Sequence, residues 1–365
     1  MNVAVTGANG FIGKNLISHL QTMDGIFVIP ITKDISFKTV KDLYSEIDFV
    51  FHLAGINRPI DSEEFITGNV HYTEQLTVFL KSLSKPPEVI FASTTQAELT
   101  NEYGKSKRLA EEILLKYSRE TESDVYIYRL SNVFGKWSRP NYNSAVATFC
   151  HNIANSIPIT VHDSESIIQL IYIDDVIDAF INTMNQKKTV TIETYQKPVG
   201  EIVNLIQSFK ELGIGDYSSH LKDTFVKKLF STYTTFLPTD SLVTQILTHD
   251  NERGSFSEFA RNDDFGQFSI NVSKPGIIKG NHWHKIKHEK FIVIQGIAVI
   301  RLRQLFENQV HEIKVSSDVF NVVDIPSGYV HHIENIGEGD LITIMWANDL
   351  FTDEYPDTYP MEVYV

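Results

Sequence analysis

Three histidines and one glutamate in the last third of the chain have the spacing of a metal-binding set. His282 and His284 are separated by one residue, Glu289 follows five residues later, and His331 lies further along the chain. Residues two apart in a strand share a face, so we expect the first two histidines to point together into a barrel. Three imidazoles and a carboxylate suit zinc, iron, manganese or nickel, because ligand type alone does not select among these ions.

A tyrosine and a lysine four residues apart predict acid–base chemistry in the first half of the chain. Tyr103 and Lys107 fall on one face of a predicted helix. A nearby ammonium stabilises a phenolate and lowers the pKa of a tyrosine, so the phenol is expected to exchange a proton near neutral pH. Ser93 and Thr94, at the end of the preceding predicted strand, each offer a hydroxyl for the substrate oxygen.

A glycine-rich turn joins the first predicted strand to the first predicted helix. Glycines at this spacing allow a tight turn and let a pyrophosphate approach free N–H groups at the start of the helix. The residues expected to contact a dinucleotide here are Gly7, Asn9, Gly10, Phe11, Ile12 and Gly13. Thr32 and Lys33 follow the second strand, and Asp34 comes only after them. The basic side chain of Lys33 favours a ribose 2′-phosphate, and hence NADPH over NADH.

The elements that position these residues change in character along the chain. Up to about residue 240, buried strands alternate with amphipathic helices, which predicts a doubly wound α/β sheet of the Rossmann type. The expected strands are Met1–Thr6, Phe27–Ile31, Phe49–Leu53, Val89–Ala92 and Val125–Arg129. The expected helices include Lys14–Gln21, Tyr72–Ser84 and Ser106–Ser118.

From about Leu247, short strands alternate with turn residues, which predicts an all-β sandwich or barrel. These strands are expected at Ser255–Ala260, Gln267–Ser273, Lys290–Ile294, Ala298–Leu305, Val319–Ile325 and Leu341–Trp346. We therefore predict a nucleotide-binding domain over residues 1–243 and a metal-binding β-domain over residues 244–365.

Composition excludes several classes of protein. The 365 residues include 32 basic and 46 acidic side chains, and the net charge of −14 argues against nucleic acid as a partner. No apolar run reaches the roughly 18 residues that span a bilayer, and the first residues lack the features of a signal peptide. We expect a soluble, cytoplasmic protein without membrane insertion. The single cysteine, Cys150, is expected to be a buried structural thiol.

The first 240 residues resemble extended short-chain dehydrogenase/reductases (SDR) of the nucleotide-sugar branch. The matching pieces are Thr6–Gly13, Asp48–Gly55, Asn69, Tyr103 with Lys107, Arg129–Gly135 and Tyr172–Val176. The resemblance implies a catalytic triad of Thr94, Tyr103 and Lys107, with Tyr103 as proton donor and Lys107 holding the nicotinamide ribose. It also implies a cofactor contact at Leu53, Ala54 and Gly55. Thr95 and Gln96 stand where 4,6-dehydratases have Asp-Glu, so dehydration is not expected.

Residues 245–365 resemble the cupin family, whose two motifs match Gly276–Gly296 and Pro326–Asn335. One departure is Phe320, where the second motif usually opens on glycine. The neighbouring His288 and His332 are expected outside the ligand set, with His332 facing away from His331. Lys285 and His288 are near the motif in sequence, but this does not identify a catalytic base.

Together, the two halves resemble the CapF/WbjC-type family of bifunctional capsular polysaccharide and O-antigen enzymes. Ala54–Pro59, Gly135–Ser144 and Lys274–Gly296 match particularly well. The resemblance implies a zinc-bearing homodimer whose cupin epimerises C3 of a UDP-4-keto-6-deoxy-N-acetylhexosamine. The reductase then forms UDP-2-acetamido-2,6-dideoxy-L-talose with NADPH, on the route to UDP-N-acetyl-L-fucosamine. A reductase with a purely structural, dimerising cupin and an NADP-binding redox sensor are the alternatives.

Overall fold

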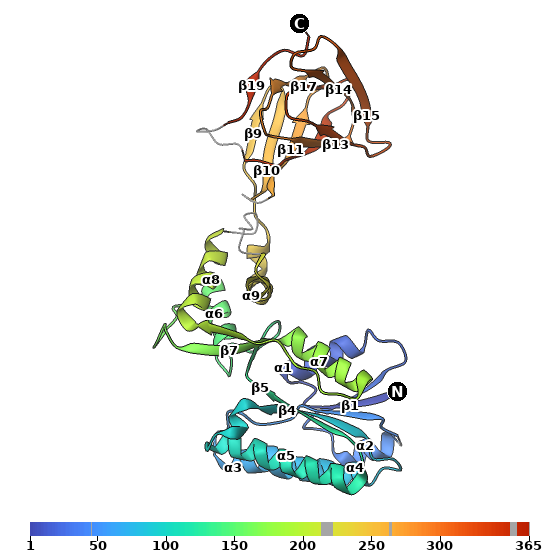
Figure 1. Ribbon diagram of the computed structural model, residues 1–365, viewed down its shortest axis with the longest axis vertical. Helices are drawn as coiled ribbons and strands as arrows, with labels where there is room; N and C mark the ends of the chain where they lie inside the picture. Colours follow the sequence, from blue (N-terminus) through green and yellow to red (C-terminus); the bar gives the residue numbers. More distant parts are fainter. Residues whose placement is uncertain (45, 213–221, 263–264, 351–355, 365) are drawn as a thin grey trace. The chain divides into compact units, whose positions relative to one another are not determined.

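The computed structural model describes residues 1–44, 46–212, 222–262, 265–350 and 356–364 (Figure 1). The chain divides into two compact units. The first comprises residues 1–210 and 225–238, and the second comprises residues 211–224 and 239–365. Each unit has its own hydrophobic core and is described separately below.

The first unit is built on a five-stranded parallel sheet with the strand order β2-β1-β3-β4-β5. Its strands are β1 (Asn2–Thr6), β2 (Phe27–Ile31), β3 (Phe49–His52), β4 (Glu88–Thr94) and β5 (Val125–Leu130). Helices cover both faces, which confirms the predicted doubly wound architecture (Figure 1). Helices α1 (Phe11–Leu20) and α7 (Ile173–Gln186) lie on one face; α2 (Phe37–Leu43), α4 (Tyr72–Lys81) and α5 (Glu102–Thr121) lie on the other.

Apolar side chains from strands and helices meet between these layers. Val50 and Phe91 of the sheet pack with Leu76 of α4 and Leu114 of α5, and all four are almost fully buried. Burial on both faces explains why the strands read as continuous apolar runs rather than as alternating patterns. Because β1, β3 and β4 are parallel, their carboxyl ends meet at one edge of the sheet, where the candidate nucleotide site lies.

Smaller elements complete the first unit. A three-stranded sheet consists of β6 (Asn132–Phe134), β7 (Ile167–Tyr172) and β8 (Tyr195–Pro198). The remaining helical segments are α3 (Glu63–Phe65), the π-helix η1 (Ile66–His71), the 3₁₀ helix η2 (Thr95–Glu98), α6 (Ala145–Ala154), α8 (Val199–Leu212) and α9 (Thr224–Thr234). Cys150 lies on the buried face of α6, as predicted.

The second unit consists of two antiparallel sheets with the orders β16-β13-β18-β11-β10-β9 and β15-β14-β17-β12-β19. The first contains β9 (Thr248–Asn251), β10 (Gly254–Asn262), β11 (Gly266–Ser273), β13 (Glu289–Gln295), β16 (Val322–Ile325) and β18 (Leu341–Ala347). The second contains β12 (Ile278–Trp283), β14 (Ile297–Gln304), β15 (Val310–Ser316), β17 (Tyr329–Asn335) and β19 (Tyr359–Pro360), and the 3₁₀ helix η4 (Thr239–Leu242) precedes both. Phe291, Ile300, Ile325 and Ile333 form the core between the sheets.

Two details of the β-unit differ from the sequence-based prediction. The strand expected over Val319–Ile325 begins only at Val322, because Val319 instead forms an isolated bridge with Ser316 across a turn in which the Asp318 N–H donates to the Ser316 hydroxyl. Strand β12 ends at Trp283, so His284 lies just beyond the strand rather than inside it.

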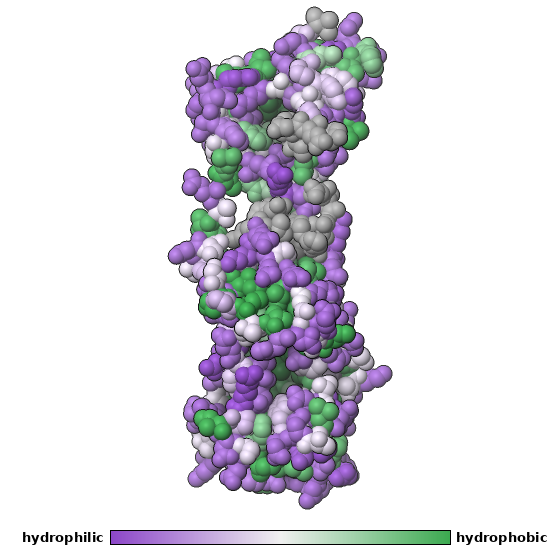
Figure 2. Space-filling view, turned by 90° about the vertical axis from the view of Figure 1, so that its left-hand side faces the viewer, coloured by the Kyte–Doolittle hydropathy of each residue, from purple (hydrophilic) through white to green (hydrophobic). Residues whose placement is uncertain are grey.

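The molecular surface is mainly hydrophilic on the face shown in Figure 2. In the part of the chain that the structure describes, no helix combines the length and apolar character needed to cross a membrane.

Candidate active sites

The glycine-rich turn packs directly against the end of β3. Gly7 has a left-handed φ of +67°, and a Cβ added there would lie 2.7 Å from the backbone nitrogen of Ala54. A Cβ on Gly13 would collide with the carbonyl oxygen of Gly7. Gly10 is the N-cap of α1 and has no side chain that could cover the first N–H groups of the helix. The turn is therefore a cradle of backbone atoms that fits a pyrophosphate.

A buried histidine fixes the strand ends behind this cradle. The Thr6 hydroxyl accepts the N–H groups of Leu53 and Ala54 at 3.1 and 3.2 Å and lies 2.8 Å from Nδ1 of His52. Nε2 of His52 lies 2.9 Å from the Thr73 hydroxyl. Burial, with a smaller contribution from the charge of a nearby lysine, lowers the pKa of His52 to about 3. The imidazole is consequently neutral and links β1, β3 and α4.

Asn69 extends this network to the helix that carries Tyr103. Its side chain bonds both backbone groups of Ile56, at 2.7 and 2.9 Å, and donates to the Ser106 hydroxyl at 2.9 Å. Ser106 in turn donates to the carbonyl of Tyr103. A Cβ on Gly55 would lie 3.0 Å from the Asn69 oxygen, so glycine is needed for this close approach. Asn69 lies in the π-helix η1, a feature often found at functional sites.

The structure brings Thr94, Tyr103 and Lys107 together at the end of β4. The side chain of Thr94 lies near enough to the Tyr103 phenol to favour its ionised form. The Lys107 ammonium donates to the carbonyl of Ala92 at 2.8 Å and lies 4.0 Å from the centre of the Phe91 ring. A Cβ on Gly55 would also lie 3.6 Å from this ammonium, so the cofactor-lining segment predicted at residues 53–55 borders the triad.

The predicted lowering of the tyrosine pKa is not what the structure shows. Burial raises the pKa of Tyr103, and the Thr94 side chain opposes this effect only in part. The Lys107 ammonium is held by the Ala92 carbonyl instead of the phenol. The prediction failed because it considered charge and omitted the loss of water around a half-buried phenol.

Ser93, the alternative to Thr94, directs its hydroxyl to a different partner. Its hydroxyl donates to the buried carboxylate of Glu111. Arg129 binds the same carboxylate through two nitrogens, at 3.1 and 2.7 Å. Glu111 also affects the lysine: burial lowers the pKa of Lys107 to about 7, while the charge of Glu111 raises it. The sequence held a signal for Glu111 that we missed, since residues 103, 107 and 111 share one helix face.

We predict that Glu111→Gln shifts the pH profile of reduction. Without this carboxylate the pKa of Lys107 falls further, so the ammonium is lost at lower pH. The alkaline limb of kcat/KM should move down by about one pH unit, since nearby charges shift a pKa by about 1–3 units. Glu112→Gln is the matched control, because Glu112 is exposed on the same helix. Equal loss at every pH would instead assign Glu111 a packing role through Arg129.

The four predicted metal ligands converge in the second unit. One ligand atom from each of His282, His284, Glu289 and His331 lies within 4.8 Å of all the others. Glu289 Oε2 lies 3.4 Å from Nε2 of His284 and 3.1 Å from Nε2 of His331. Ligands about 2 Å from a common tetrahedral ion are separated by about 3.3 Å, so these spacings suit zinc.

Backbone carbonyl groups orient two of these imidazoles. Nδ1 of His284 bonds the carbonyl of Asp357, and Nδ1 of His331 lies 3.3 Å from the carbonyl of Tyr329. Such bonds leave the other ring nitrogen available to a metal ion. Asn281 adopts a left-handed φ of 60° at a β-bulge in β12, which brings His282 opposite His331. His282 and His284 therefore converge through a β-bulge and the bond from His284 to the Asp357 carbonyl, not through the predicted two-residue alternation of a regular strand.

The donor atoms of the cluster fit a cation. Among the described side chains, Nε2 of His284, Oε2 of Glu289 and Nε2 of His331 are buried without a hydrogen-bond partner. Burial lowers the pKa of His282 to about 4, and the neighbouring His331 acts in the same direction. Burial disfavours the charged form of Glu289, but the two adjacent imidazoles outweigh it and lower the pKa of this carboxyl. The cluster is therefore prepared to bind positive charge.

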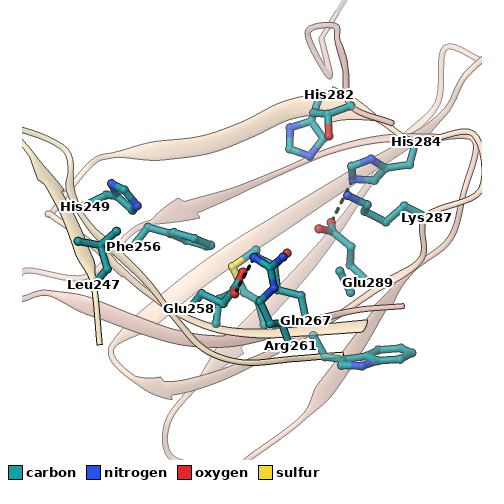
Figure 3. A pocket seen from close by; sticks show the side chains of 15 residues that line it. Leu247, His249, Phe256, Glu258, Arg261, Gln267, His282, His284, Lys287 and Glu289 are labelled. Carbon is teal, nitrogen blue, oxygen red and sulfur yellow. Dashed lines mark ion pairs between the residues drawn. The ribbon is translucent and has the colours of Figure 1, made fainter. Parts of the chain in front are cut away.

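A cavity of about 620 Å³ opens onto three of these residues (Figure 3). Its wall includes His282, His284, Glu289, Lys287, Arg261 and Trp346. Lys287 is buried and reaches toward His284 and Glu289 in Figure 3. The cavity thus combines three of the candidate metal ligands with Lys287 and with Arg261, which pairs with Glu258 on the same wall.

Neither of the two residues considered as a base is among the described residues that line this cavity. Lys285 is exposed, with its ammonium 4.6 Å from the Tyr359 ring, and His288 lies 3.1 Å from the Asp324 carboxylate. His332 bonds Asn281 at 2.7 Å, on the face away from the cluster, as predicted.

Three basic side chains of the first unit are also of interest, two of them in the Gly135–Ser144 segment. Lys136 pairs with Asp174, and Arg139 lies 5.1 Å from the Tyr142 ring. Lys33 is exposed just beyond the end of β2.

Comparisons with known proteins agree with this two-part construction. Residues 3–197 match the NAD dependent epimerase/dehydratase family, and residues 249–359 match the polysaccharide biosynthesis C-terminal domain. A Pseudomonas aeruginosa protein named UDP-2-acetamido-2,6-beta-L-arabino-hexul-4-ose reductase is 42% identical over 368 residues, covering 100% of this chain and 99% of the relative. The crystal structure of the capsular polysaccharide assembling protein CapF from Staphylococcus aureus has a TM-score of 0.90 at 39% identity, covering 99% of this chain and 100% of that one. The chain belongs to the CapF family.

Membership in the CapF family confirms the predicted resemblance and the succession of a Rossmann-like sheet and a cupin-like β-domain. It also makes this protein an oxidoreductase. The structure of RMD from Pseudomonas aeruginosa with NADPH matches at a TM-score of 0.55 and 18% identity, over 65% of this chain and 99% of that one, which shows a shared fold.

Proposed function

We propose that this protein is a bifunctional nucleotide-sugar enzyme of capsular polysaccharide or O-antigen synthesis. Residues 244–365 epimerise C3 of a UDP-4-keto-6-deoxy-N-acetylhexosamine, and residues 1–243 reduce its C4 ketone with NADPH. The product is UDP-2-acetamido-2,6-dideoxy-L-talose, which leads to UDP-N-acetyl-L-fucosamine. One observation carries the proposal: a single chain holds a Thr–Tyr–Lys group beside a nucleotide cradle and a buried His₃Glu cluster in a separate cavity.

Epimerisation needs removal of an acidic hydrogen next to the C4 carbonyl and return of a proton to the other face. His282, His284, Glu289 and His331 would hold a zinc ion. When bound, the ion supplies positive charge that stabilises a developing enediolate. Lys287 and Arg261 in the same cavity suit the anionic UDP group.

Reduction adds a hydride to C4 and a proton to its oxygen. NADPH supplies the hydride when bound. Tyr103 donates the proton, and the burial that raises its pKa keeps the phenol protonated for this purpose. Thr94 contacts both Tyr103 and the substrate oxygen, while Lys107 holds the nicotinamide ribose. The Gly7–Gly13 turn receives the pyrophosphate.

We predict that Lys33→Ala weakens NADPH binding selectively. The exposed ammonium just beyond β2 supports a contact with a ribose 2′-phosphate, and such charge-assisted contacts contribute about 1.5–3 kcal/mol. KM for NADPH should rise about 10-fold or more, with KM for NADH unchanged. Lys38→Ala on α2 is the control. Equal effects on both cofactors would contradict the proposed 2′-phosphate contact.

The deciding experiment is incubation with candidate UDP-4-keto sugars and NADPH in deuterated water. We expect NADPH oxidation, deuterium at C3 of the product and the L-talo configuration. Reduction without exchange would favour the alternative in which the cupin is purely structural, and NADPH binding without oxidation would favour a sensor. The family resemblance also supports a zinc-bearing homodimer. Light scattering of the loaded protein tests the dimeric state through its molar mass.

A further inference from the structure

Asp357 lies over the turn that follows His284. Its carboxylate accepts the backbone N–H groups of three consecutive residues, Lys285, Ile286 and Lys287, at 2.9, 3.0 and 2.8 Å. The backbone carbonyl of Asp357 accepts the bond from Nδ1 of His284. One residue therefore holds both the imidazole of a proposed metal ligand and the main chain that leads from it to the next ligand.

The backbone at Asp357 is adapted to this double role. Its φ is +37°, in a region that favours glycine and that Asp and Asn enter more readily than other residues. This conformation turns the carboxylate and the carbonyl of the same residue toward one turn of the barrel. No pattern in the sequence indicates this role of Asp357, because the residue is 73 positions from His284 along the chain.

The segment carrying Asp357 is held independently of these bonds. Strand β19 pairs with β12 at His282 and Trp283, and the Trp283 ring stacks on Tyr359 with 4.8 Å between centres. Further on, Arg303 donates to the carbonyl of Val363 at 2.7 Å. Loss of the Asp357 carboxylate should therefore leave the segment in place and release only the turn.

We propose that Asp357 is the positioning residue of the metal site in the barrel, an inference that rests on the proposed function of this site. Its carbonyl selects the tautomer of His284 that presents an Nε2 lone pair to the cluster. Its carboxylate closes the turn that leads to Glu289. Outer partners of this kind typically change metal affinity by about 10–100-fold.

The test measures zinc affinity by competition with a chelating dye, using the full chain. Asp357→Asn retains the backbone conformation and one oxygen acceptor, so we expect about 10-fold weaker binding. Asp357→Gly keeps the left-handed φ and the backbone carbonyl but has no side-chain acceptor, so about 100-fold weaker binding is expected. Asp340→Asn, which removes a carboxylate paired with Lys274 elsewhere in the barrel, should bind as the wild type does.

Two further readouts separate positioning from a merely structural role. In cobalt-loaded protein, the absorption bands should shift in Asp357→Gly and stay unchanged in Asp340→Asn, because only the former alters the ligand geometry. Wild-type zinc affinity in Asp357→Gly, with a lower unfolding temperature of the metal-free protein, would overturn the proposal. Absence of zinc binding by the wild type would instead overturn the proposed metal site and this inference together.

Discussion

Tyr103→Phe is expected to abolish NADPH oxidation while solvent deuterium still enters the keto sugar. The phenol is the proposed proton donor to the C4 oxygen, and loss of a positioned acid typically costs about 10²–10⁴-fold in rate. Phenylalanine keeps the ring that packs against Phe65, with centres 5.7 Å apart, so folding and cofactor binding should persist. Exchange belongs to the cupin domain in the proposed scheme and does not need this hydroxyl.

The control for this variant is Tyr126→Phe, which removes a phenol that bonds Glu88 on the same sheet. Its rate should match the wild type. Thr94→Val and Ser93→Ala complete the test, because the Thr94 hydroxyl acts on the Tyr103 phenol whereas the Ser93 hydroxyl bonds Glu111. Loss of both reduction and exchange in Tyr103→Phe would contradict the two-site scheme.

His282→Ala and Glu289→Ala are expected to empty the metal site and remove deuterium exchange. Each substitution removes one ligand from the four-residue cluster. Without the ion, the developing enediolate loses electrostatic stabilisation of a kind that typically contributes about 10²–10³-fold to a rate. Reduction of a sugar that already has the product configuration at C3 should continue, because Tyr103 lies in the other unit. Metal content and exchange are measured on the same samples.

His288→Ala is the matched control, since His288 precedes Glu289 and bonds Asp324 instead of the cluster. It should retain metal and exchange. Zinc should raise the unfolding temperature of the wild type but not of Glu289→Ala, because a ligand that binds only the folded state stabilises it. Exchange that persists in a folded, metal-free variant would make the metal structural and assign the proton chemistry to other groups.

Local sequence patterns determined much of this protein. Strand-and-helix alternation is a local property, so the parallel sheet and the glycine turn could be predicted from residues 1–13 and the buried strands. Tyr103 and Lys107 are on one helix, where the helical repeat alone places them together. The types and spacing of His282, His284 and Glu289 likewise indicated a metal cluster, because a short β-segment keeps such residues close.

Tertiary packing decided the properties that depend on distant residues and on water. Burial reversed the predicted direction of the Tyr103 pKa, since desolvation depends on everything that packs around the phenol. Ser93 and Thr94 are neighbours in sequence, but only the fold shows that Glu111 takes one hydroxyl and that the other acts on Tyr103. The bond from His284 to Asp357 joins residues that no local pattern relates. Residue type and spacing thus determined which groups can do chemistry, and long-range packing decided their orientation and charge.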